Sequence, residues 1–463
     1  MLMLWPLVVL VLFSAQRPER AFVWSIVGGY LILPPVAAFD IPLFPDLDKN
    51  TIPALSVLVV ATLMKGHRIE LLPRSRTLRV LIVLFVFSPL ATALTNGEPV
   101  SLVDRMQGWN PMADGVRVLP GLSPYDGLAM MLWQVSALIG FALARHFLAT
   151  PAALRELLMA LVVGGLLYTP LMLLEIRLSP QLNTWVYGFF QHDWLQMVRS
   201  GGFRPIVFLP HGLWVAFFIL TSVLAAVGLA RAEPASRTRL AAAALWLAAV
   251  MALCKTLGVV IYAAVFLPVL LMASPRTILR LCVVLAAFAF TYPILRASGI
   301  LPVDGILAFF EGFNPARAQS LGFRFDNETV LLDHALRKPW FGWGPFERNL
   351  VLDPVTGEPM SISDGRWVIV FGIFGSVGYA LEFGIFLATI LLLARRPGPV
   401  EPVVAVVALI LSVNLLDLIP NATLTPITWM MLGAIIGVLD SDRRALAAAR
   451  RLHIRGQEAR TVL

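Results

Sequence analysis

Long apolar runs recur along the whole chain, and they limit the possible fold more than any other feature of the sequence. Many of them approach the ~20 residues that a helix needs to cross a bilayer. Hydrophobic residues make up 58% of the 463 residues and charged residues only 14%, a balance not found in soluble globular domains. A transmembrane β-barrel would show short alternating segments instead. The sequence therefore predicts an all-α fold, a polytopic transmembrane helical bundle.

We expect about 12–13 spans, each bounded to within several residues. The predicted spans are 3–15, 21–39, 51–64, 80–95, 126–148, 152–175, 205–230, 238–254, 257–274, 277–295, 366–393, 402–418 and 423–439. The first run is short and starts at Met1. It is either a full span, a re-entrant piece or part of a signal-like start, and we treat it as an anchor.

The segments between the spans alternate in charge. Basic segments lie at 17–20, 65–79, 145–155, 231–239, 276–280, 395–396 and in the tail 440–463. The positive-inside rule places these segments in the cytoplasm. The alternate segments are longer and mix both signs, and by alternation they face outward: 40–50, 96–125, 176–204 and 296–365. The net charge of +8 then reflects which side of the membrane the Lys and Arg residues face, and it does not indicate nucleic-acid binding.

One candidate anion-binding group precedes the span at 205–230. Arg204 lies at the mouth of this span, after two glycines that permit close backbone approach and before Pro205, which suits a first helical turn. It either snorkels to lipid headgroups or binds an anion, because guanidinium stays charged and binds phosphate bidentately. Lys255, on a short outward turn, is either an interfacial anchor or a further positive charge at the same site.

The outward segment 296–365 is by far the longest polar stretch, and long structured loops cluster at functional sites. Plotted as a helix, residues 322–338 place Arg324 and His334 on one side. This helix either lies on the outer leaflet or presents a phosphate-binding arginine beside a titratable histidine. Asp364 and Arg366 open the next span. Asp364 either caps that helix in a salt bridge or orients or deprotonates a hydroxyl.

Other kinds of site have no support in the sequence. Cys254 and Cys282 lie within or at the edge of apolar runs, and we interpret both as small buried hydrophobic residues. No His/Cys cluster has metal-ligand spacing, and no phosphate-binding or dinucleotide-binding glycine motif is present. We therefore expect neither a metal nor a cofactor.

The order of these features resembles the O-antigen ligase and polymerase superfamily of bacterial inner-membrane proteins. The likeness covers about residues 200–395 and is carried by Gly202-Phe203-Arg204, Arg324, Pro339-Trp340-Phe341-Gly342-Trp343-Gly344, Ser363-Asp364-Gly365 and Phe371-Gly372-Ile373-Phe374-Gly375. It divides the chain into N-terminal transmembrane helices (1–200), a ligase/polymerase-like core (201–395) and C-terminal spans with a basic tail (396–463). Residues 1–200 match only in hydropathy.

The resemblance implies a donor glycan linked to undecaprenyl pyrophosphate and handled at the periplasmic face of the inner membrane. It implies that Arg204 and Arg324 hold the pyrophosphate and that a base activates an acceptor hydroxyl. We expect Arg366 and Lys255 to be further pyrophosphate-binding cations. Ligases of the superfamily carry a histidine shortly before the loop feeds the next span, where this chain has Asp364. We expect Asp364 to be the base, with His334 as its rival.

Three functions follow from these observations. The first is metal-independent polymerisation of lipid-linked glycan repeat units, as in O-antigen or exopolysaccharide biosynthesis, which the aspartate at position 364 favours. The second is ligase-type transfer of a glycan to a lipid, protein or other acceptor. The third is a transporter or flippase, which should place ionisable groups near mid-span. Glu382 and Asn414 are the main candidates for such groups, whereas most polar residues lie in the outward segments, which favours an enzyme.

Overall fold

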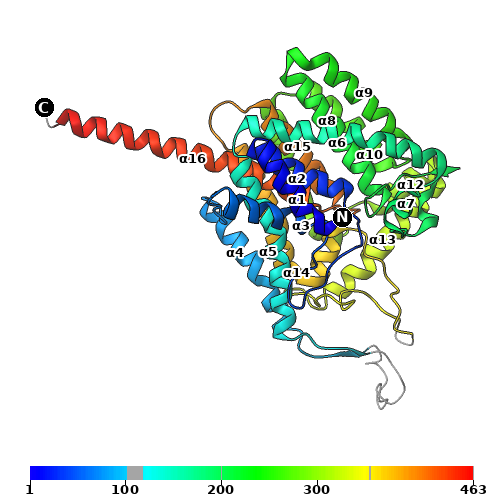
Figure 1. Ribbon diagram of the computed structural model, residues 1–463. Coiled ribbons are helices and arrows are strands. Elements are labelled where there is room, and N and C mark those ends of the chain that lie inside the picture. Colours follow the sequence, from blue (N-terminus) through cyan, green and yellow to red (C-terminus); the bar gives the residue numbers. More distant parts are fainter. Residues whose placement is uncertain (102–117, 200, 354–355, 462–463) are drawn as a thin grey trace.

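The protein is a bundle of helices, as the sequence predicts (Figure 1). The computed structural model describes residues 1–101, 118–199, 201–353 and 356–461. It is 70% helix and 3% strand, and each predicted span overlaps a helix. Within the described residues, 7 helices are long and apolar enough to cross a membrane, and four apolar helices are shorter. The all-α class is therefore confirmed, while the full number of spans stays a prediction.

The α-helices are α1 (Trp5–Ala15), α2 (Pro18–Ile32), α3 (Ile52–Val59), α4 (Arg76–Leu94), α5 (Pro124–Phe147), α6 (Pro151–Leu178), α7 (Leu182–Tyr187), α8 (Gly212–Ala232), α9 (Arg237–Leu253), α10 (Leu257–Met272), α11 (Pro275–Ala297), α12 (Val303–Phe313), α13 (Pro315–Ala335), α14 (Arg366–Ala394), α15 (Pro402–Asp417) and α16 (Pro426–Thr461). Short helical turns are η1 (Leu2–Leu4), η2 (Val60–Met64), η3 (Trp194–Met197) and η4 (Pro234–Ser236). Two antiparallel hairpins pair β1 (Val100–Ser101) with β2 (Val118–Leu119) and β3 (Val198–Arg199) with β4 (Gly202–Phe203).

Many of the helices begin at a proline that follows a turn. Proline suits this place because its missing N–H would have no intrahelical partner there. At the start of α5, the Ser123 side chain accepts the backbone N–H of Asp126, whose carboxylate accepts the N–H of Ser123. Thr150 caps α6 and Ser274 caps α11 in the same way, each accepting one backbone N–H. These caps end the connecting segments sharply and set where each span starts.

Polar contacts join connecting segments within each of the two predicted sets of loops. Among the basic segments, Arg145 pairs with Asp440 at 3.2 Å and Arg396 pairs with Asp442 at 2.6 Å. Among the mixed-charge segments, the Lys338 ammonium donates to Asn96 at 2.7 Å. The grouping of the loops thus agrees with the charge alternation. The side of the membrane that each group faces stays a prediction, and 102–117 of the predicted outward loop 96–125 lie outside the described residues.

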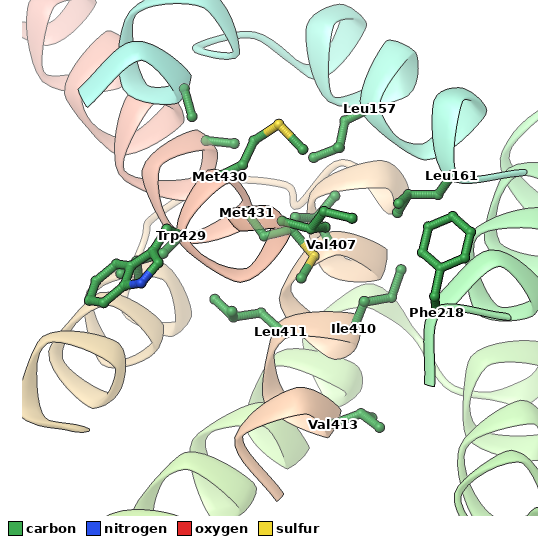
Figure 2. Close-up of a cluster of buried hydrophobic side chains, with 14 of the residues drawn as sticks. Leu157, Leu161, Phe218, Val407, Ile410, Leu411, Val413, Trp429, Met430 and Met431 are labelled. Atoms are coloured by element: carbon green, nitrogen blue, oxygen red, sulfur yellow. The ribbon is translucent and has the colours of Figure 1, made fainter. Parts of the chain in front are cut away.

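The centre of the bundle is α15, which packs against α6, α8, α11 and α16. Figure 2 shows apolar side chains of α15 meeting those of α6, α8 and α16: Leu157, Leu161, Phe218, Val407, Ile410, Leu411, Val413, Trp429, Met430 and Met431. All of these are buried. Because α15 is enclosed on all sides, its last residue, Asp417, and the turn that follows it are held at a fixed place at one end of the bundle.

The most unusual local structure is a break in α14. Gly375 has φ 68° and ψ −169°, so residues before and after it form two separate helical halves. In a continuous helix, the carbonyls of Gly372 and Ile373 would accept the N–H groups of Ser376 and Val377. Those carbonyls instead accept the N–H groups of Trp343 and Gly344, at 2.8 and 3.0 Å.

The freed N–H groups of Ser376 and Val377 donate to the carbonyls of Pro339 and Trp340, at 2.7 and 3.1 Å. The segment 339–344 thus replaces the missing helical hydrogen bonds, which an apolar surrounding requires. We call this contact the glycine interlock. It gives the Pro-x-x-Gly-x-Gly run a structural role, and the resulting bend brings Arg366 to Glu382, with guanidinium–carboxylate distances of 2.8 and 2.7 Å.

We predict that Gly342→Ala lowers the thermal stability of the purified protein. Gly342 has φ 67°, and a Cβ there would lie 2.5 Å from the Ile373 carbonyl oxygen. A left-handed conformation for a residue with a side chain costs about 1–3 kcal/mol even without the clash. The measurement is the midpoint of thermal unfolding in detergent.

The matched control is Gly384→Ala in the second half of α14, where the nearest atom to a Cβ is a Phe290 ring carbon at 3.7 Å. This variant should unfold at the temperature of the parent chain or above it. Equal midpoints for the two variants would show that the interlock contributes nothing to stability.

Candidate functional site

A cavity of about 770 Å³ lies at the end of the bundle where α15 finishes. Its walls come from five stretches of the chain: 192–214, 256–262, 310–324, 362–364 and 417–422. Arg204, Arg324 and Asp364, which the sequence analysis selected from distant positions, all line it. The structure therefore brings the two predicted pyrophosphate-binding arginines and the predicted base together.

Arg204 enters the cavity from an irregular segment between β4 and α8. Its backbone N–H donates to the Met197 carbonyl at 2.8 Å, which continues the short hairpin. Its side chain is 3% exposed, and its Nε atom has no hydrogen-bond partner. Among the described residues, no carboxylate forms an ion pair with it. Burial and the nearby Arg199 and Arg317 lower the pKa of Arg204 to about 10, so the guanidinium is still charged at neutral pH.

A buried cation without a counter-ion is costly, because desolvation is not offset by an opposite charge. Within the described residues no carboxylate offsets this cost, and a bound anion would lower it. The other interpretation from the sequence was an arginine that reaches lipid headgroups. It does not fit a side chain that is almost entirely enclosed.

The backbone that carries Arg204 is held by Glu175 of α6. One oxygen of Glu175 accepts the N–H groups of Ile206 and Val207, both at 2.8 Å, and the other accepts the N–H of Leu182 at 3.0 Å. Val207 has φ 50°, a left-handed conformation that a β-branched residue rarely adopts. Two successive N–H groups in such a bend form a concave anion site, and here the anion is the Glu175 carboxylate.

Two further buried side chains hold the next residue of the same segment. The Lys49 ammonium donates to the Phe208 carbonyl at 2.7 Å, and the Tyr168 hydroxyl accepts the Phe208 N–H at 3.0 Å. Lys49 is 2% exposed, and this burial lowers its pKa to about 7. The strained segment is thus fixed from three directions, which gives Arg204 a defined position.

Arg324 reaches the cavity from α13. Its Nη1 atom donates to the Pro420 carbonyl at 3.1 Å and to the Asn421 side-chain oxygen at 3.2 Å. Its Nε atom lies 3.4 Å from a carboxylate oxygen of Asp364. Asp364 therefore pairs with Arg324 at the cavity wall, whereas one sequence interpretation was a salt-bridged cap with its neighbour Arg366. The ion pair fixes the orientation of the Asp364 carboxylate beside the pyrophosphate-binding candidates.

The structure adds cavity-lining residues that the sequence analysis did not select. Arg199 and Arg317 add two cations, His192 and His211 add two imidazoles, and Asp417 adds one carboxylate. Arg317 lies seven residues before Arg324 on the same helix, a spacing that could have been noticed. His211 gave no such signal, because the sequence predicted a span starting at residue 205, whereas α8 begins at Gly212 and residues 205–211 form an irregular segment.

His211 is held in a single neutral form. Its Nδ1 atom accepts the backbone N–H of Leu213 at 2.9 Å, so the proton of the neutral ring is on Nε2. Its ring centroid lies 4.5 Å from that of His192. Burial, then His192 and Arg204, lower the pKa of His211 to about 3. At neutral pH the Nε2–H group of this ring is therefore a hydrogen-bond donor at the cavity wall.

Three predicted site residues do not line the cavity. The Lys255 ammonium donates to the Arg199 carbonyl at 2.9 Å, so it supports the hairpin before Arg204. The His334 Nε2 atom lies 3.0 Å from the Arg348 carbonyl oxygen, and its ring stacks on Trp343 with centroids 4.5 Å apart. Arg366 points to the opposite side and pairs with Glu382. Each of these side chains supports the structure around the cavity.

Other expectations concern the wider chain. Cys254 and Cys282 are both buried and unbonded, as the sequence analysis predicted. In the part of the chain that the structure describes, no group of three or more His, Cys, Asp or Glu residues is placed to hold a metal ion. Comparison with models of known protein families and with the sequences of curated proteins finds no match.

We predict that Glu175→Ala destabilises the protein strongly. Three buried backbone N–H groups would lose their acceptor, at about 1–3 kcal/mol for each group left unsatisfied. Thermal unfolding in detergent measures the loss. Glu156→Ala on the same helix is the control, because its side chain is 34% exposed and exposed ion pairs contribute about 0–1 kcal/mol. If both variants were equally stable, Glu175 would not hold the segment.

We predict that the stability of the protein depends on pH through the protonation of His211. Its pKa is about 3 in the folded chain and ordinarily about 6.5 when unfolded. The unfolded chain therefore binds more protons between these values, and stability rises with pH in this window. The contribution is complete above about pH 6.5 and is lost as the pH falls toward 3.

Thermal unfolding measured from pH 7.5 to pH 5 tests this expectation. His211→Asn should flatten the dependence, because the Asn side-chain oxygen can still cap α8 but does not titrate. An unchanged pH slope in this variant would contradict the assignment of a neutral, buried ring. Lys49, His192 and His334, whose pKa values are also lowered by burial, contribute to the slope that remains.

Proposed function

We propose that the protein polymerises glycan repeat units carried on undecaprenyl pyrophosphate, at the periplasmic face of the bacterial inner membrane. The observation that carries the proposal is the convergence of Arg204, Arg324 and Asp364 on one cavity. A buried, unpaired guanidinium beside further arginines suits a diphosphate. The apolar helices around the cavity suit a long isoprenoid chain.

The donor binds through its charge. Four arginines line the cavity, Arg199, Arg204, Arg317 and Arg324, against the two carboxylates Asp364 and Asp417. The excess positive charge matches a pyrophosphate diester, and guanidinium groups can contact both phosphates at once. The neutral His211 adds an N–H donor. No nucleotide is required, because the pyrophosphate linkage is already activated.

The transfer step uses one base and the arginine cluster. The acceptor hydroxyl oxygen forms a bond to the anomeric carbon of the donor sugar, and the bond from that carbon to the pyrophosphate oxygen breaks. The hydroxyl proton passes to the Asp364 carboxylate, and undecaprenyl pyrophosphate leaves with the bonding electrons. The arginines stabilise the charge that develops on the leaving oxygen. Asp364 acts as the general base.

A ligase that moves a finished glycan to another acceptor would use the same donor chemistry and remains the alternative. A transporter is less well supported. The two mid-span groups that would favour transport already have partners: Glu382 pairs with Arg366, and Asn414 hydrogen-bonds Thr423 and Thr428.

Arg204→Ala and Arg324→Ala should each reduce glycan polymerisation about ten- to hundredfold or more, since a lost charge-assisted contact costs roughly 1.5–3 kcal/mol. The measurement is chain extension by purified protein supplied with undecaprenyl-pyrophosphate-linked oligosaccharide. Lysine at either position should restore activity only in part, because the bidentate geometry is lost. Arg239→Ala, at the basic end of the bundle, is the control. Normal extension by either cavity variant would refute the donor site.

Asp364→Asn should abolish turnover while donor binding survives, because the amide keeps the shape of the carboxylate and cannot accept the proton. His334→Ala should retain turnover, since its ring contacts Arg348 and Trp343 outside the cavity. Single-turnover rates and donor binding, measured separately, distinguish these effects. Unchanged turnover in Asp364→Asn would leave that residue with only its ion pair to Arg324.

A further inference from the structure

A second cavity, of about 200 Å³, lies on the other side of the segment that carries Asp364. Helices α2, α3, α4, α5, α14 and α16 contribute to its walls. Large apolar faces come from Phe85, Trp133, Phe374 and Trp429. Polar groups also line it: Asn50, Thr51, Gln134, Arg366, Glu382 and Thr425. None of these groups belongs to the arginine-lined cavity.

Two features of the second cavity point to a ligand. Gln134 is 6% exposed, and its side-chain oxygen has no hydrogen-bond partner. Glu382 is 1% exposed and pairs with Arg366 at 2.7 Å, so a charged pair lies among apolar helices. An unsatisfied buried acceptor is costly, and buried ionisable groups in membrane proteins are rare outside functional sites.

The two cavities share one wall. Asp364 lines the first cavity and Arg366 lines the second, two residues further along the chain. The Arg366 N–H donates to the carbonyls of Leu418 and Asn421, at 2.9 and 3.1 Å, which ties this wall to the turn after α15. Ala422 of that turn lines both cavities. A molecule in the second cavity therefore lies next to the segment that carries the proposed base.

We propose that the second cavity binds the terminal sugar ring of the acceptor glycan, an inference that rests on the proposed function. Aromatic faces suit the C–H faces of a sugar, and an amide with a planar ion pair suits its hydroxyl groups. An isoprenoid chain would leave the Gln134 oxygen without a donor. The acceptor sugar would then lie beside the wall formed by residues 364–366 and Ala422, which carries the proposed base on its other side.

The experiment uses two reporter cysteines in the full chain, Ser136→Cys in the second cavity and Ser320→Cys in the arginine-lined cavity. Labelling by a maleimide reagent is followed with and without two probes. The native cysteines are fully buried, and the parent chain is the blank. The probes are undecaprenyl pyrophosphate without sugar, and the free repeat-unit oligosaccharide released from the lipid-linked glycan of the source cells.

We expect the oligosaccharide to slow labelling of Ser136→Cys about tenfold when it is present at about ten times its Kd. Undecaprenyl pyrophosphate should protect Ser320→Cys and leave Ser136→Cys reactive. Adding Gln134→Leu to the Ser136→Cys chain should remove protection by the oligosaccharide. The same change in the Ser320→Cys chain should leave protection by undecaprenyl pyrophosphate intact, which also shows that the variant folds.

The outcomes separate this inference from the proposed function. Full labelling of Ser136→Cys in the presence of the oligosaccharide overturns the acceptor site. Protection of Ser136→Cys by undecaprenol, which has neither sugar nor phosphate, overturns it in favour of an isoprenoid-binding cavity. If undecaprenyl pyrophosphate fails to protect Ser320→Cys while the oligosaccharide still protects Ser136→Cys, the donor assignment fails and the saccharide site stands.

Discussion

The glycine interlock is the contact on which the arrangement of both cavities depends. A helix that breaks among apolar neighbours must find new partners for its backbone groups, and the segment 339–344 supplies four of them around Gly375. This allows the first half of α14 to turn back, so that Arg366 meets Glu382 and Asp364 meets Arg324. Without the break, residues 366 and 382 would lie about 24 Å apart along one helix axis.

The positive charge of the arginine-lined cavity depends on which partners the nearby carboxylates bind. Both oxygens of Glu175 accept backbone N–H groups, so this carboxylate holds the segment 204–208 and does not pair with the guanidinium. Arg204 is buried, its Nε atom has no hydrogen-bond partner, and no carboxylate among the described residues pairs with it. Arg324 differs, because Asp364 pairs with it. In the proposed site, Arg204 is the group that binds the pyrophosphate without a competing carboxylate, whereas Arg324 also positions Asp364, the proposed base.

The helices were predictable because apolar runs and proline starts are local signals, and each predicted span overlaps a helix. The convergence of Arg204, Arg324 and Asp364 was suggested by motif order. Other features depend on tertiary contacts. The roles of Glu175 and Lys49 could not be read from the sequence, since each acts on backbone more than thirty residues away. Arg366 and His334 were predicted as site residues, but their side chains do not line the first cavity, because Arg366 pairs with Glu382 and the His334 ring contacts Arg348 and Trp343.

The support of Arg204 by Lys49, Tyr168 and Glu175 has a consequence for how such a protein can diverge. These three residues all precede position 200 and so lie outside the proposed ligase/polymerase-like core at 201–395. The proposed core at 201–395 therefore depends on residues outside it for the backbone conformation beside Arg204. A chimaera that joined this core to the first helices of another membrane protein would keep every motif residue and would lose the buried groups that hold the strained backbone beside Arg204.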